Sequence, residues 1–344
     1  MDLPRLLADL LGAFLGGALA ASLGALGGFV LFGFVGVAGF IAVLLSGDAH
    51  WLAALTGSAL LRPSSCFLGG VVAAAWAKRR GHLHCGKDIG RPLLEFRRGG
   101  LLIVGGFGGV AGFLANLAFD SVLGGRVDTV GLAVCAVPLV LKFAWNLRTS
   151  ADCAGSSHAV PSPYRFFERL ASPRGKGTVC VLASVAAASL TLALANHPGA
   201  APFAGLAGFC LSALSLVVLF LGVPLPVTHH FTGPAGTATA VCLAAQAGPS
   251  GVEGLAGLLA WAVFAGALSL GASEFLGRLF FEVGDIHVDP PAMGIVASTA
   301  IVLGVLPTAG VLHLPVPMQA TMALAGAVAT LLLPRLLPRR KPVA

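Results

Sequence analysis

The sequence has few charged residues and no long polar segment. Only 10% of its 344 residues are charged, 57% are hydrophobic, and tyrosine occurs once. The longest polar stretches, 78–98 and 148–176, are too short to enclose a hydrophobic core of their own. These deficits exclude a soluble globular protein and predict an all-α polytopic membrane protein, in which apolar helices follow one another from end to end.

Sequence motifs for nucleotide binding and hydrolysis are also absent. We find no Walker lysine motif, GxSxG, HExxH or Rossmann fingerprint. The seven cysteines show no CxxC spacing, so we expect free thiols and no disulfide framework. The net charge of +7 lies in loops and the C-terminal tail, where membrane topology explains it better than nucleic-acid binding. The expected partner is the lipid bilayer, with no nucleic acid.

The most informative stretch is 223–246, where a long apolar run is interrupted. Pro224 and Pro226 precede the adjacent histidines His229 and His230. Proline removes a backbone donor and clashes with the preceding helical turn, so the freed carbonyls need protein or water as partners at membrane depth. The interruption therefore predicts a segment that lines a cavity, and it is the strongest site candidate in the sequence.

An internal duplication is indicated by aligning each residue n with residue n+180. The matching positions fall in apolar runs and end with a histidine and an aromatic residue in both copies. The pairs are Leu26 and Leu206, Gly28 and Gly208, Phe29 and Phe209, Leu31 and Leu211, His50 and His230, and Trp51 and Phe231. A second echo relates 87–92 to 284–291. We predict repeat 1 over 1–150, a cytoplasmic linker over 151–176 and repeat 2 over 177–344.

Segment length suggests how the repeats cross the membrane. Residues 3–45 are too long for one crossing at roughly 1.5 Å per residue against a core of about 30 Å, so we split them near Gly24. The segment 51–77 is interrupted by Arg62 and Pro63, and each arm is too short to cross alone. It is either one kinked crossing or a re-entrant hairpin that leaves on the side it entered.

The distribution of basic residues favours the hairpin. If 51–77 and its counterpart 226–272 both return to their starting side, one face collects 19 of the 21 Lys and Arg, whereas single crossings split them 13 to 8. The positive-inside rule prefers the first arrangement. It predicts 8–12 crossings and two parallel repeats; the alternative is a 5+5 inverted repeat.

One resemblance accompanies that alternative. Leu225-Pro226-Val227-Thr228 is similar to part of the Leu-Pro-Val-x-Thr-x-Pro-Phe signature of the urea transporters. The resemblance covers four residues, places the threonine differently and lacks the Pro-Phe that follows. It implies a small-solute channel with five-plus-five inverted repeats and a half-helix before the third crossing.

Polar residues of the interrupted segments form the predicted substrate pathway. They are Asp48, His50, Arg62, Thr228, His229 and His230. Imidazole titrates near neutrality, so His50 and His230 are suited to bind a polar solute or to relay a coupling proton. The competing interpretation places both histidines among interfacial residues of the aromatic belt, and for His229 we favour it. Arg62 either faces a cavity or snorkels to water.

A third cluster offers metal ligands. Asp285, His287 and Asp289 alternate along the chain, so an extended segment places all three on one side, where they suit a divalent ion. The competing interpretation is that Asp289, before two prolines, caps the start of a helix. A divalent metal and a coupling proton are thus the candidate cofactors.

Together these features favour a permease or channel for a small polar solute or ion in a cell membrane, such as an inner membrane. Two alternatives stay open: an intramembrane metal-dependent enzyme and a membrane scaffold or assembly protein. Glycine-rich helix faces, such as the one containing Gly105, Gly106, Gly108 and Gly109, indicate close helix packing and leave a homo-oligomer open.

Overall fold

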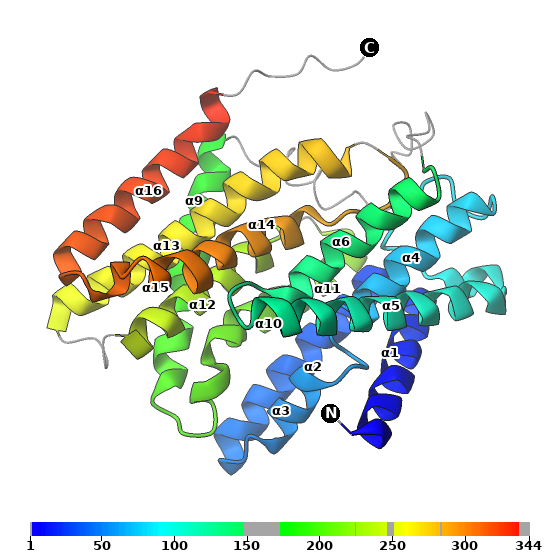
Figure 1. Cartoon of the computed structure of the whole chain (residues 1–344), viewed down its shortest axis with the longest axis horizontal. Coiled ribbons are helices and arrows are strands. Elements are labelled where there is room, and N and C mark those ends of the chain that lie inside the picture. The colour runs from blue at the N-terminus through cyan, green and yellow to red at the C-terminus, as the bar shows by residue number, and fades with distance from the viewer. Residues whose placement is uncertain (1, 148–172, 224, 246–250, 283, 337–344) are drawn as a thin grey trace.

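A computed structural model describes residues 2–147, 173–223, 225–245, 251–282 and 284–336 (Figure 1). Every regular element in these ranges is a helix, and seven of them are long and apolar enough to cross a membrane. The prediction of an all-helical multi-pass membrane protein is therefore confirmed. Most of the predicted linker 151–176 lies outside the described residues.

The first half begins with two crossings joined at a glycine. Gly24 has a φ of +84°, which favours glycine, and it ends the first helix and begins the second, as the length of 3–45 predicted. The elements of this half are α1 (Leu3–Leu23), α2 (Ala25–Ser46), α3 (His50–Gly57), α4 (Cys66–Arg79), the short η1 (Leu93–Phe96), α5 (Gly99–Leu123) and α6 (Thr129–Ala144).

Contacts between helix ends fix the direction of each crossing. The junction of α1 and α2 meets the basic loop 80–98, because the Leu26 N–H donates to the Ile89 carbonyl at 3.0 Å. We call this side of the molecule the basic face. Helix α1 therefore runs toward the basic face and α2 runs away from it. Helix α3, the bend at 58–65 and α4 together lead back to the basic face, where Arg79 donates to the Trp145 carbonyl at the end of α6 (3.0 Å).

The structure thus differs from the expected hairpin over 51–77, which crosses to the other side as one broken helix. The prediction of parallel repeats was wrong for this reason. The charge comparison misled because the 13-to-8 split assumed single crossings of both segments, whereas in the structure 51–77 crosses once and 226–272 forms two helices, α12 and α13.

The second half contains four of the seven candidate membrane spans and two further helices, α12 and α16. Its elements are α9 (Pro173–Ala195), η2 (Ala201–Leu206), α10 (Ala207–Ser215), α11 (Val217–Phe220), α12 (His229–Ala245), α13 (Gly251–Leu276), η3 (Gly277–Phe281), α14 (Pro290–Thr299), η4 (Ala300–Val305), α15 (Leu306–Thr308), η5 (Val311–His313) and α16 (Val316–Leu336).

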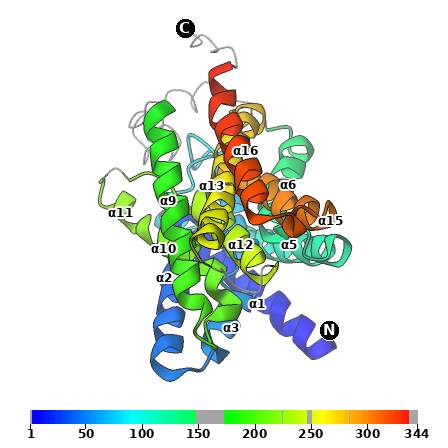
Figure 2. The ribbon, with the colours of Figure 1, turned by 90° about the vertical axis from the view of Figure 1, so that its left-hand side faces the viewer.

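Two side-chain contacts orient this half. Lys176 pairs with Glu274 at 2.8 Å and so joins the start of α9 to the end of α13 on the basic face. Trp261 donates to Gln319 at 3.2 Å and joins the early part of α13 to the start of α16, toward the opposite face. Both views place the start of α1 and the end of α16 on opposite sides of the molecule (Figures 1 and 2).

The two halves therefore run in opposite senses. Helix α1 runs toward the basic face, whereas α9 runs away from it, and in each half the third crossing is broken before its helix begins, at 58–65 and at 221–228. This order corresponds to the 5+5 inverted alternative, with α16 as one additional crossing. Helices of opposite halves pack together as α2 with α10 and as α6 with α14.

Glycine allows the helices of the first half to touch through their backbones. A Cβ at Gly109 of α5 would overlap the Ala13 carbonyl and approach the backbone of Gly17 on α1. In lipid the hydrophobic effect does not drive helices together. Dispersion attraction across such close backbone contacts stabilises their packing instead. The glycine-rich face predicted from the sequence therefore serves packing within the chain.

This packing leads to a test with a control in the same helix. Gly109→Ala is expected to destabilise the protein by about 1–3 kcal/mol, because the methyl group overpacks a backbone contact. Gly100→Ala, where no atom lies within 4 Å of the added Cβ, is expected to be neutral or slightly stabilising. The midpoint of thermal unfolding in detergent distinguishes them, and equal midpoints would contradict the backbone contact.

The crossing directions lead to a second test. Leu3 and Leu94 are both exposed, at 67% and 59%, and lie near opposite faces. The variants Leu3→Cys and Leu94→Cys are expected to react with an impermeant thiol reagent from opposite sides of the membrane, above the labelling of the parent protein. Reaction of both variants from the same side would contradict these crossing directions and support the hairpin over 51–77.

Candidate functional site

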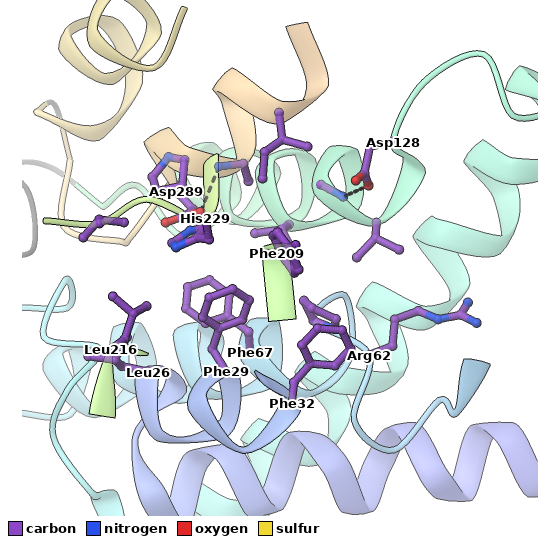
Figure 3. Close-up of a pocket in the computed structure, with 18 of the residues that line it drawn as sticks. Leu26, Phe29, Phe32, Arg62, Phe67, Asp128, Phe209, Leu216, His229 and Asp289 are labelled. Atoms are coloured by element: carbon purple, nitrogen blue, oxygen red, sulfur yellow. Dashed lines mark hydrogen bonds between the residues drawn. The ribbon is translucent and has the colours of Figure 1, made fainter. Parts of the chain in front are cut away.

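A cavity of about 180 Å³ lies where the two halves meet. It is lined by paired elements of the two halves: α2 and α10, α6 and α14, and the two broken third crossings (Figure 3). Its lining is mostly apolar, with six polar or charged side chains among the described residues. These six are Thr56, Arg62, Asp128, His229, His287 and Asp289.

Two aspartates occupy matching positions in this lining. Asp128 caps α6 by accepting the Gly131 N–H at 2.7 Å, and Asp289 caps α14 by accepting the Ala292 N–H at 2.9 Å. A side-chain oxygen at the N-cap satisfies a backbone donor that has no partner within the helix. The expected capping role of Asp289 is therefore confirmed, and each half contributes one such carboxylate to the cavity.

The helices that carry these caps are also linked to each other. The Asp128 N–H donates to the Thr299 hydroxyl of α14 at 3.0 Å, and the Cys135 thiol of α6 lies 3.9 Å from the Asp289 carbonyl oxygen. Because α6 and α14 run in opposite directions, each helix contacts the capping residue of the other.

Four phenylalanines form the aromatic part of the lining. Phe29 is central: its ring centroid lies 6.4 Å from Phe32, 5.9 Å from Phe67 and 5.6 Å from Phe209. Phe29 and Phe209 are partners in the n+180 alignment, as are Leu26 and Leu206, which also line the cavity. The first part of the sequence echo therefore relates two antiparallel helices, α2 and α10, that meet at the site.

Two buried histidines lie beside Asp289. His287, 2% exposed, contacts an Asp289 carboxylate oxygen through Nε2 at 2.9 Å. His229, 7% exposed, packs edge-on against Phe29 at 4.8 Å and lies close to Asp289 in Figure 3. The Nδ1 atoms of both histidines have no hydrogen-bond partner among the described residues. A buried polar atom without a partner costs about 1–3 kcal/mol, so these two atoms are an energetic cost that the fold carries beside the cavity.

The structure brings only part of the predicted pathway to this cavity. His229 lines it, whereas His230 packs against Phe231 at 3.9 Å and is not in the lining, the reverse of the order preferred from the sequence. Thr228 bonds to Ser212 at 2.5 Å and does not line the cavity. Arg62 lines the rim, and its guanidinium donates to the Gly57 carbonyl at 2.9 Å.

Asp48 and His50 lie elsewhere, at the exposed start of α3. There Asp48 accepts the His50 N–H at 2.8 Å, and the His50 ring packs against Trp51 at 5.9 Å. The sequence alignment of His50 with His230 does not bring these residues to one site, because His50 begins the exposed α3 whereas His230 lies buried in α12.

The predicted metal ligands are not brought together either. His287 and Asp289 form a pair, but Asp285 accepts the Gly86 N–H at 2.8 Å and lies 3.8 Å from the Lys78 ammonium. No group of three metal-ligating side chains occurs among the described residues. Asp285 instead joins the two halves at the basic face.

We call the cluster of Lys78, Gly86 and Asp285 the basic-face contact. Lys87 reinforces it by donating to the Glu282 carbonyl at 3.3 Å. Both loops that form it continue into the cavity lining, at Ile89 and at His287. The cavity is thus covered on this side by contacts between residues far apart in the sequence.

One cysteine of loop 80–98 is not a free thiol, in contrast to the expectation from the sequence. Cys85 takes part in a disulfide bond, so the expectation that all cysteines are free was wrong at this position. Nearby, burial raises the pKa of the Asp88 carboxyl, and the positive charge of Arg91 opposes this shift.

Sequence reasoning missed Asp128 and the phenylalanines. Asp128 is an isolated acid before the apolar run of α6, and comparing its position with Asp289, at the start of the corresponding helix, was the available signal. Phe29 and Phe209 were already paired by the alignment, but in a membrane protein apolar aromatic residues do not by themselves indicate a site.

Comparison with known proteins gives a family but no activity. A family model described as "Family of unknown function (DUF7973)" matches residues 3–164 and 185–321, which is most of the chain. No curated protein and no solved structure matches. The resemblance to urea transporters therefore has no support beyond the four residues that suggested it.

The capping geometry leads to a test. Asp289→Ala is expected to destabilise the protein by about 0.5–2 kcal/mol, because the first turn of α14 loses its side-chain acceptor. Asp289→Asn is expected to stay near the parent, since asparagine caps helices comparably. Thermal unfolding of the two variants measures the difference. If both variants lost the same stability, the charge and not the cap would be the stabilising feature.

Proposed function

The chain belongs to this family of unknown function, and from its structure we propose that it is a permease of the cell membrane that carries a small solute through the cavity between its two halves. The observation that carries this proposal is the cavity itself. It is lined by both halves, at the position where both third crossings are interrupted.

The placement of the breaks supports transport. Irregular backbone at membrane depth is tolerated where protein buries it or where it lines a cavity, and transporters commonly place their binding sites at such breaks. Here Pro63 and Phe67 from one break and Val227 and His229 from the other line the same cavity. A scaffold protein has no need to hold two helix interruptions around one enclosed space.

The inverted halves support alternating access as the mechanism. In transporters built from inverted repeats, one half moves against the other and exposes a fixed site to each side in turn. In this structure the basic-face contact joins the halves and covers the cavity on that side. Opening toward the basic face requires that Asp285 separates from Gly86 and Lys78.

The test measures access to the cavity with a matched pair of variants. Val227 lines the cavity and is 4% exposed, whereas Val140 lies on α6 and is 64% exposed on its apolar outer surface. Val227→Cys is expected to react with an impermeant methanethiosulfonate reagent added from either side of the membrane. Val140→Cys is expected to react from neither, because a thiol facing lipid does not ionise.

Labelling of the parent protein provides the baseline. Adding Asp285→Ala to Val227→Cys removes a side chain of the basic-face contact and is expected to increase labelling from the basic face. Absence of Val227→Cys labelling from both sides would contradict a transport pathway. Labelling from one side only, even with Asp285→Ala, would indicate a binding or catalytic pocket in place of a permease.

A further inference from the structure

The acidic and basic side chains of the cavity lining occupy different parts of the cavity. Among the described lining residues the acids are Asp128 and Asp289, and Arg62 is the base. In Figure 3 the Arg62 guanidinium extends away from Phe29 and Phe67, whereas both carboxylates lie across the cavity from these rings. Arg62 is half-buried and donates to the Gly57 carbonyl. Among the described lining residues, the two carboxylates therefore have histidines but no lysine or arginine beside them.

From this arrangement we propose, on the basis of the transport function proposed above, that the solute is a small organic cation: a protonated amine with an apolar body. An ammonium group beside Asp289 supplies the positive charge that the lining lacks. Asp289 already accepts hydrogen bonds from His287 and from the Ala292 N–H, and a carboxylate in a low-dielectric site attracts a further cation strongly.

The histidines specify the hydrogen-bonding side of this ligand. Asp289 accepts a hydrogen bond from Nε2 of His287, so in the neutral ring Nε2 carries the proton and Nδ1 is an acceptor. This Nδ1 atom has no partner among the described residues. Nδ1 itself is enclosed by protein, whereas the Asp289 side chain is 14% exposed and is the acceptor that an ammonium N–H in the cavity can reach.

The phenylalanines suit the rest of the ligand. Phe29, Phe32, Phe67 and Phe209 meet mostly edge to face, so the cluster presents both ring edges and ring faces. Ring faces attract cations, and the rings also bury an apolar body. A ligand with an ammonium head and a hydrocarbon or aromatic tail uses both properties.

The first turns of the two broken helices are partly satisfied within the chain, which weakens them as sites for an anion. A helix N-terminus binds anions through free N–H groups. In α4 the N–H groups of Cys66 and Leu68 already donate to carbonyls of the preceding turn, at 2.9 and 3.1 Å. In α12 the N–H groups of Phe231 and Thr232 both donate to the Thr228 carbonyl, at 2.9 and 3.0 Å.

Three probes of similar size and different charge test the proposal by calorimetric titration of the full chain in lipid nanodiscs. They are 2-phenylethylammonium, 2-phenylethanol and 3-phenylpropanoate. The cation is expected to bind at least about tenfold more tightly than the alcohol or the anion, which is the magnitude of one charge-assisted contact.

Asp289→Asn keeps the helix cap and removes the charge, so it is expected to fold like the parent and to weaken cation binding by about tenfold. Asp2→Asn makes the same change at the N-cap of α1, outside the cavity, and is expected to leave binding unchanged. Phe209→Leu is expected to weaken binding of the cation more than binding of the alcohol, because it removes the ring face but keeps an apolar side chain.

Preferred binding of the anion or the alcohol, binding of none of the three probes, or unchanged cation binding by Asp289→Asn would overturn the proposed ligand class. These outcomes are separate from failure of the transport function, which shows in the labelling of Val227→Cys. A cavity that is reachable from both sides but does not bind 2-phenylethylammonium would leave the permease proposal intact.

Discussion

Unpaired backbone groups are the constraint on which this structure depends. A break in a membrane helix exposes N–H and C=O groups that lipid cannot satisfy, and each such group costs several kcal/mol. Among the described residues, the third crossing of each half is broken before α4 and before α12, and the residues next to these helices, Ser64, Ser65 and Val227, are buried. Covering the breaks with α2, α6, α10 and α14 brings the two halves together and leaves the cavity between them.

Much of the fold could be predicted from the sequence because the signals are local. Gly24 divides two crossings, Pro226 lies in the break before α12, and Asp289 before two prolines caps a helix. Each of these depends on the conformational limits of one or two residues. Apolar length then fixes the class of membrane protein.

The direction of the repeats could not be predicted in this way, because it depends on few charges. The parallel and inverted arrangements keep loop 78–98 on the same face and differ mainly in the position of Arg5. The choice between His229 and His230 was equally undetermined. Successive residues on a helix point about 100° apart, so the side that faces the cavity depends on how α12 is rotated against its neighbours.

The contacts between α6 and α14 couple the surroundings of Asp128 to those of Asp289. Each helix contacts the residue that caps the other, through Asp128 with Thr299 and through Cys135 with Asp289. A shift of one helix along the other therefore changes the surroundings of both carboxylates together. A ligand that engages Asp289 consequently alters the free energy of the arrangement at Asp128, and by reciprocity an event at Asp128 changes affinity at Asp289 by the same factor. The packing of α6 against α14 therefore couples ligand binding at Asp289 to the surroundings of Asp128.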